Sequence, residues 1–298
     1  LNPMPSVTAN HLTLEYESLG NDSDPPLLLI MGMAMQLVGW PDAFCHKLVQ
    51  QGFRVIRFDN RDMGLSTSFD HLGHPNVPAA FGRYLLRLPL HPPYLIDDMA
   101  DDAAGLIDAL NLGPTHIVGV SMGGMIGQSL TARYPEKIRS LTSIMSSTGR
   151  RSLPPPTWKT TLAMLEKPAR RDDLEGAIDR LYRALRLVSG PIKDSDEFLR
   201  AHSERHVRRY YNPAASARHL LAVSGSGDRS KTIAQINKPT LVIHGAADPL
   251  LPPEHGRETA RLIPNARFNL IDGMGHTLPA PLHERLTADI AAHCRAAS

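Results

Sequence analysis

The segment around Ser121 restricts the possible folds more than any other part of the chain. Residues 115–120 contain a short β-branched run that is typical of a buried strand, and a helical pattern runs from Met125 to about residue 134. Between them lies Gly-Val-Ser-Met-Gly at 119–123. A serine between two glycines on a sharp strand-to-helix turn is a nucleophile elbow, because glycine lacks the Cβ atom that would block the bend. A glycine-rich turn that only connects strand to helix is the alternative interpretation.

The elbow also predicts a site for a developing negative charge. Ser121 Oγ would project away from the sheet, beside the backbone N–H of Met122 at the start of the helix. A second N–H should come from the loop that follows the apolar strand pattern at 27–31. Met33, just after Gly32, is our candidate for this second donor of the oxyanion hole. Alternatively, this loop is only a tight apolar connection.

Two glycine-rich turns further along the chain offer partners for the serine. Asp248 follows a strand pattern at 239–244, and His276 follows another at 266–271. In a parallel sheet, both turns would lie at the same edge as the elbow. His276 would then take the proton of Ser121, and Asp248 would hold the imidazole tautomer and stabilise the imidazolium. The alternative interpretations are a loop histidine and a helix-capping aspartate.

Other carboxylates fit the acid role less well. Asp272 is close to His276 in sequence but stands at a strand end, where capping or positioning the loop is the better interpretation. The strand pattern at 138–145 is the alternative place for the acid, and only Ser-Ser-Thr follows it, at 146–148. Asp248 is therefore preferred by exclusion as well as by position.

Methionines gather around the predicted site in the sequence. They are Met31, Met33, Met35, Met122 and Met125. Methionine fills irregular apolar space and adapts to varied ligands. We expect Gly32, Met35 and Met125 to line a pocket for an apolar acyl or alkyl group, with ordinary core packing as an equally good alternative.

The rest of the chain alternates between strand and helix patterns. Further strand patterns occur at 11–17 and 53–58, and helical patterns at 40–51, 96–110 and 282–294. Residues 69–95 indicate an extended loop with one short helix at 81–88. The alternation predicts an α/β fold, a mostly parallel twisted sheet with helices on both faces.

One long interval interrupts this alternation. From residue 147 to 237 no strand pattern occurs, whereas helical patterns appear at 174–185 and 198–211, and Asn212 is placed to cap a third helix. We therefore expect a helical lid at 147–237, inserted between two parts of one core, 1–146 and 238–298.

Composition argues against several classes of function. The chain has 298 residues, of which 42% are hydrophobic, which is ample for a large core. Its net charge of +2 gives no reason to expect a nucleic-acid partner. The two cysteines, Cys45 and Cys294, indicate neither a disulfide framework nor a zinc cluster. There is no phosphate loop or dinucleotide fingerprint, so we expect no cofactor.

A metal site and a membrane span are also disfavoured. His202 and His206 are four residues apart on a predicted helix, but no third ligand accompanies them, and arginines crowd the same helix. A solvated basic face is the better interpretation of that helix. The apolar run that begins at Leu27 is too short to cross a bilayer, and no basic segment precedes it as in a signal peptide. We expect a soluble, cytoplasmic protein.

Taken together, these motifs resemble the α/β-hydrolase superfamily over essentially the whole chain. The matching segments are 31–33, 58–66, 119–123, 245–248 and 275–276. The combination is most similar to the lid-bearing carboxylesterases that include aclacinomycin methylesterase. Many members carry His-Gly where this chain has Met31-Gly32, and the methylesterase-like branch also has Met-Gly. In the family, the segment 58–66 is a structural turn. The resemblance implies the order serine, aspartate, histidine for the triad.

The resulting hypothesis is a carboxylic-ester hydrolase that acts through an acyl-enzyme on Ser121. Its substrate would be a small-molecule ester with an apolar acyl or alkyl part. A lactonase, thioesterase, C–C bond hydrolase or cofactor-free perhydrolase could use the same triad. Epoxide hydrolases and haloalkane dehalogenases are disfavoured, because they carry an aspartate at the position of Ser121. A non-catalytic ligand receptor on the same fold is the rival from a different class.

Overall fold

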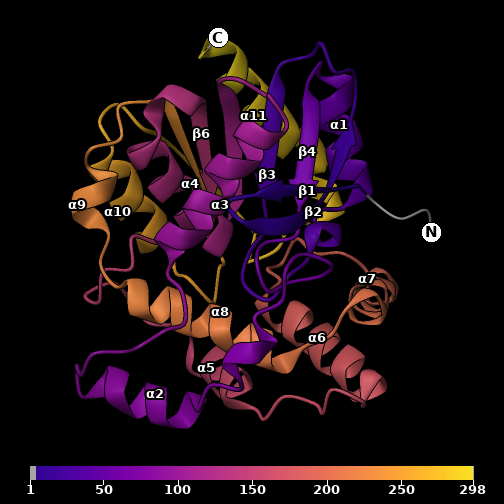
Figure 1. Ribbon diagram of the computed structural model, residues 1–298, viewed down its shortest axis with the longest axis vertical. Helices are drawn as coiled ribbons and strands as arrows, with labels where there is room; N and C mark the ends of the chain where they lie inside the picture. Colours follow the sequence, from indigo (N-terminus) through magenta and orange to yellow (C-terminus); the bar gives the residue numbers. More distant parts are fainter. Residues whose placement is uncertain (1–4, 298) are drawn as a thin grey trace.

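A computed structural model describes residues 5–297, and these residues contain one eight-stranded sheet. The strands are β1 (Ser6–Ala9), β2 (Leu12–Leu19), β3 (Pro26–Ile30), β4 (Arg54–Phe58), β5 (Thr115–Val120), β6 (Ile138–Ile144), β7 (Thr240–Gly245) and β8 (Arg267–Ile271). Their order across the sheet is β1-β2-β4-β3-β5-β6-β7-β8. β2 pairs antiparallel with both of its neighbours, β1 and β4. The remaining neighbours, in the order β4-β3-β5-β6-β7-β8, are parallel (Figure 1). The predicted mostly parallel sheet is confirmed.

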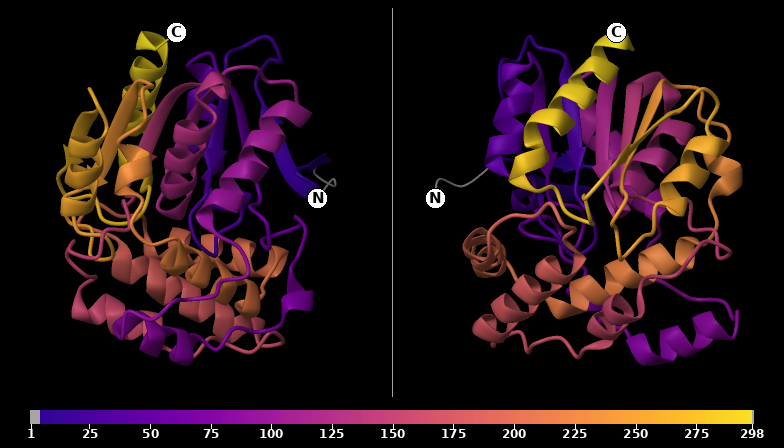
Figure 2. Two further views of the ribbon diagram at one scale, coloured as in Figure 1. Left: turned by 60° about the vertical axis from the view of Figure 1, so that its left-hand side comes forward. Right: turned by 180° about the vertical axis from the view of Figure 1, so that it is seen from behind.

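Helices cover both faces of this sheet. The helices that follow or connect its strands are α1 (Asp42–Gln50), α3 (Ile96–Ala109), α4 (Met122–Arg133), α10 (Glu254–Leu262) and α11 (His283–Ala296). α1 and α11 pack together on one face, whereas α3 and α4 pack on the other (Figure 2).

Two apolar layers separate the sheet from these helices. Leu28 and Ile30 of β3 face the layer under α3 and α4, whereas Leu27 and Leu29 face the layer under α1 and α11. Both sides of the strand are therefore buried, which explains its unbroken apolar run. No helix within the described residues is long and apolar enough to cross a membrane.

Helices also fill the chain between β6 and β7. They are α5 (Trp158–Leu165), α6 (Leu174–Val188), α7 (Asp196–Arg209), α8 (Pro213–Ser226) and α9 (Ser230–Ile233). We refer to residues 147–237 as the helical segment. Figures 1 and 2 show α5 to α8 gathered with α2 (Val77–Leu85) beyond one end of the sheet, whereas α9 lies beside α4 and α10.

Several elements differ from the sequence-based expectations. The short helix expected at 81–88 is α2, which begins earlier because Asn76 caps it by accepting the N–H of Ala79. The elbow helix starts at Met122 rather than Met125. β1, α5 and α10 were not predicted, since β1 is a four-residue edge strand and α10 carries few apolar residues.

Candidate active site

Ser121 occupies the turn between β5 and α4. Its φ and ψ of 56° and −119° lie in a region that L-residues rarely adopt. The residue is held there from both sides, since its N–H donates to Ile144 O at 2.9 Å and Ser146 Oγ donates to its carbonyl at 2.7 Å. Such strain persists only where the surroundings impose it, and it is concentrated at functional sites.

The two flanking glycines are required by close backbone contacts. A Cβ atom on Gly119 would lie 2.2 Å from Gly123 O, and one on Gly123 would lie 2.0 Å from Ile30 O. Neither backbone oxygen can move aside without breaking the sheet or the helix start. The tight packing of α4 on β3 and β5 therefore explains both glycines of the motif.

The three residues expected to act together lie in one hydrogen-bonded line. His276 Nε2 is 3.0 Å from Ser121 Oγ, and His276 Nδ1 is 2.6 Å from Asp248 Oδ2. Asp248 comes from the turn after β7 and His276 from the turn after β8, at the carboxyl edge of the sheet. The helical segment also contacts this line, because His276 N–H donates to Val188 O at the end of α6.

Asp248 is held as a carboxylate by its surroundings. Its side chain is fully buried, and Oδ1 accepts the N–H groups of Leu250 and Leu251, each at 2.9 Å. Burial by itself would raise the pKa of Asp248. The positive charge that His276 carries when protonated, and hydrogen bonds from His244, His276 and the backbone of Leu251, outweigh burial and hold the pKa well below its usual range. An ionised carboxylate on Nδ1 leaves Nε2 of a neutral imidazole free to accept a proton.

His244 is a neighbour of this line that the sequence analysis missed. It lies on β7, fully buried, with Nε2 2.8 Å from Leu251 O and 3.5 Å from Asp248 Oδ2. Its position in a buried strand, just before Gly245, is the one signal that could have indicated it.

The loop after β3 passes directly beside the serine. A Cβ atom on Gly32 would be 3.2 Å from Ser121 Cβ. Residues 32–35 form a turn in which Met35 N–H donates to Gly32 O at 3.3 Å, and Asn60 Nδ2 donates to Met31 O at 3.0 Å. Met122, the first residue of α4, has an amide with no partner inside the helix. Both predicted oxyanion donors, Met33 and Met122, therefore belong to segments that meet at Ser121.

The predicted pocket residues differ in their surroundings. Met125 is buried in the apolar layer under α3 and α4, which is the position expected from the core-packing interpretation. Met35 is only half-buried and packs against the opposite layer. Asp272, the rejected acid, is exposed at the end of β8.

The histidines of α7 do not lie on a solvated face, and that expectation is wrong for part of the helix. His206 is buried, and burial lowers its pKa to about 3. Arg209 points inward and pairs with the buried Asp59, with Nη2 2.8 Å from Oδ2. The exposed part of the basic face consists of Arg200, Arg205 and Arg208.

Comparison with known proteins agrees with this fold. Residues 25–279 match the family described as alpha/beta hydrolase fold. The chain belongs to the α/β-hydrolase family. The resemblance deduced from its motifs is thereby confirmed.

Two relatives match this α/β hydrolase along its full length. Rhodomycin D methylesterases from Streptomyces sp. (strain C5) and from Streptomyces peucetius are each 33% identical to it over 99% of both chains. Among solved structures, a meta-cleavage product hydrolase from Pseudomonas fluorescens IP01 has a TM-score of 0.74 at 18% identity, over 99% of this chain and 98% of the other. The enol-lactonase from Burkholderia xenovorans LB400 has a TM-score of 0.70 at 21% identity, over 98% and 100%. These two structures share the fold.

Proposed function

We propose that this α/β hydrolase is a serine carboxylesterase and that Ser121, His276 and Asp248 are its catalytic triad. The observation that carries the proposal is the hydrogen-bonded line from Asp248 through His276 to Ser121 at a strained elbow. The two methylesterases that match the whole chain support the methyl ester of a carboxylic acid as its substrate class.

The reaction follows from the position of each group. Ser121 Oγ attacks the ester carbonyl while His276 Nε2 takes its proton, and Asp248 stabilises the imidazolium through Nδ1–H. The amides of Met33 and Met122 hold the oxyanion. His276 then protonates the leaving alcohol, and water, activated by the same imidazole, releases the acid from the acyl-enzyme.

In this proposal, the helical segment is the lid of the site, set between core parts 1–146 and 238–298. Its contact with the turn that carries His276 is close: a Cβ atom on Gly275 would be 2.3 Å from Gly190 N. Lid side chains would thus form the wall opposite the sheet edge, with Gly32, Met35 and Met125 on the sheet side of an apolar acyl or alkyl pocket.

Hydrolysis of p-nitrophenyl esters from acetate to decanoate, and of methyl esters of aromatic acids, tests the proposal. We expect many turnovers per protein in the wild type and a loss of at least about 10⁴-fold in Ser121→Ala. The circular dichroism spectrum of the variant should match the wild type, because only one hydroxyl is removed.

A fluorophosphonate probe separates the remaining outcomes. Stoichiometric labelling of Ser121 without turnover of the esters would indicate a narrow substrate range. If neither labelling nor turnover occurs, the triad proposal is wrong, and a ligand receptor on this fold becomes the better explanation.

A further inference from the structure

The turn beside Ser121 has a conformation that its own residues do not favour. Ala34 is the third residue of the turn closed by Met35 N–H and Gly32 O, and its φ is +60°. A positive φ at this position characterises a type II turn, in which glycine is the usual residue. An alanine there is strained, by about 1–2 kcal/mol, so contacts from elsewhere must hold the turn.

One such contact comes from helix α8. His219 Nδ1 is 3.3 Å from Ala34 N, and His219 Nε2 is 2.9 Å from Arg61 O. Because a carbonyl can only accept, Nε2 carries the proton and Nδ1 is left to accept the N–H of Ala34. The two bonds together define one neutral tautomer of the ring.

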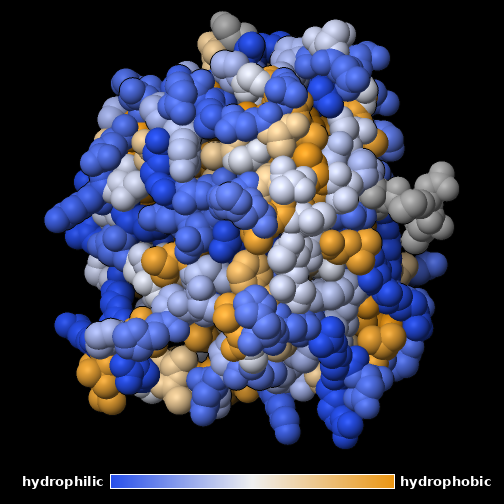
Figure 3. Space-filling model, viewed as in Figure 1, coloured by the Kyte–Doolittle hydropathy of each residue, from blue (hydrophilic) through white to orange (hydrophobic). Residues whose placement is uncertain are grey.

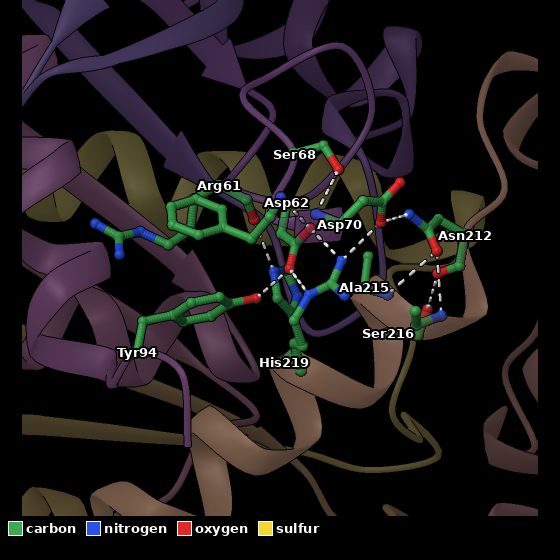
Figure 4. A network of polar contacts seen from close by, with 12 residues as sticks. Arg61, Asp62, Ser68, Asp70, Tyr94, Asn212, Ala215, Ser216 and His219 are labelled. Atoms are coloured by element: carbon green, nitrogen blue, oxygen red, sulfur yellow. Dashed lines mark hydrogen bonds and ion pairs between the residues drawn. The ribbon is translucent and has the colours of Figure 1, made fainter. Parts of the chain in front are cut away.

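The surroundings keep His219 neutral and in place. The residue is fully buried, its ring and that of Tyr94 are nearly perpendicular, and burial lowers the pKa of His219. The neighbouring Arg218 holds α8 against the core, since its Nη2 donates to Asp62 Oδ1 at 2.7 Å, and Tyr94 Oη donates to Asp62 Oδ2 at 2.8 Å. Figure 4 shows Asp62, Tyr94 and His219 gathered at this contact.

Helix α7 contacts the same loop just after this turn. Burial lowers the pKa of His206, and the nearby backbone of Ala34 partly offsets that lowering. Next along the loop, Gln36 Nε2 donates to His206 O at 2.7 Å and to Tyr210 O at 2.9 Å. The loop that contains Ala34 therefore contacts both α7 and α8 of the helical segment.

The contact with His219 affects the conformation of the turn because it binds the N–H of the central peptide. Type I and type II turns differ by a flip of their central peptide, which here joins Met33 to Ala34 and carries the Ala34 N–H. An acceptor fixed opposite that N–H selects one orientation of the peptide. The same turn carries the Met33 amide that, in the proposed function, faces the oxyanion.

We propose that His219 is a positioning residue that holds the oxyanion turn in its active geometry from the helical segment. The proposal rests on the esterase function proposed above. It makes the oxyanion hole dependent on the docking of α8, so the helical segment contributes to catalysis as well as covering the site.

A matched pair of substitutions tests the role of the ring nitrogen that faces Ala34. His219→Asn can place its amide oxygen at the level of Nδ1 and accept the Ala34 N–H, whereas His219→Gln reaches toward Arg61 O and leaves Ala34 unbonded. We expect kcat to fall about 10- to 100-fold in His219→Gln, part of the 10²–10³-fold cost of losing an oxyanion donor. In His219→Asn, kcat should stay within about threefold of the wild type, and KM should change little in either variant.

Two further measurements separate positioning from general damage. The affinity for a trifluoromethyl ketone, whose adduct carries an oxyanion, should fall in parallel with kcat in His219→Gln alone. Urea denaturation should show similar destabilisation of both variants, since each loses one hydrogen bond of the ring. Equal kcat in the two variants, or a loss of kcat with unchanged ketone affinity, would overturn the proposal.

One more measurement distinguishes failure of the positioning role from failure of the proposed esterase function. The rate at which a fluorophosphonate labels Ser121 depends on the oxyanion hole but needs no ester to be recognised, so it is measured in the same variants. Slower labelling in His219→Gln than in His219→Asn supports the positioning role even if no ester is turned over. Equal rates overturn it, and an unlabelled wild type overturns both proposals.

Discussion

The interior of the sheet and the contact between the helical segment and the core are both buried, but different interactions hold them. β3 and β5 are buried among apolar side chains on both faces. The helical segment is instead anchored by charged groups with little solvent exposure: Arg218 with Asp62, and Arg209 with Asp59. We call these two ion pairs the anchoring pairs.

The two kinds of interaction differ in how strictly they fix the geometry of the groups involved. Apolar burial stabilises the sheet at about 25 cal/mol per Å² and tolerates small shifts of the packing. A buried ion pair gains little net free energy, because desolvation offsets the attraction, but it is costly to break and demands one geometry. We infer that the sheet interior supplies stability, whereas the anchoring pairs set where α7 and α8 lie over the turn beside Ser121.

Gly123→Ala tests the sheet side of this comparison and should have the largest effect. Its Cβ would lie 2.0 Å from Ile30 O, so the helix must move off the sheet, and we expect destabilisation of more than about 4 kcal/mol or no folded protein. Gly82→Ala in α2 is the control, because its Cβ meets nothing within 4 Å and alanine favours the helix. Chemical denaturation measures both. A folded Gly123→Ala of wild-type stability would contradict the close packing of α4.

Arg218→Met tests the anchoring pairs. It leaves the Asp62 carboxylate buried without its cation, so we expect a loss of about 3–5 kcal/mol of unfolding free energy, measured in urea. The matched control is Arg186→Met, which removes an exposed pair with Asp196 and should cost at most about 1 kcal/mol. Similar losses in the two variants would show that burial of the anchoring pair has no special role.

Acidification tests one buried histidine in each region and should give the smallest effect for any single residue. Burial lowers the pKa of His116, on β5, to about 4 and that of His206, on α7, to about 3. Between pH 6.5 and 4 the unfolded chain therefore binds more protons at these residues than the folded one, so stability falls as the pH falls. Each histidine contributes a slope of up to about 1.4 kcal/mol per pH unit. Urea titrations between pH 7.5 and 4.5 measure it.

The variants His116→Gln and His206→Gln show which region is responsible. Each should flatten the loss of stability between pH 6.5 and 4, because glutamine does not titrate. An unchanged slope in either variant would mean that the replaced histidine is protonated in the folded protein.

Much of the sheet could be predicted because its signals are local. The apolar run at 27–31 and the strand patterns at 115–120 and 239–244 lie within a residue or two of β3, β5 and β7. Ser121, Asp248 and His276 could be proposed together for the same reason, since each follows a parallel strand and such strands end at one edge. The methionine pocket was harder to predict, because methionine serves core and ligand equally well.

The sequence by itself determined the sheet, the elbow and the order of the three candidate catalytic residues, because periodicity and glycine spacing act over a few residues. Tertiary structure alone decided how the turn beside Ser121 is held. Ala34 and His219 are 185 positions apart, and no local pattern relates them. Whether a histidine of α7 or α8 faces water or a backbone amide depends on where its helix docks, and buried charges distant in sequence set that position.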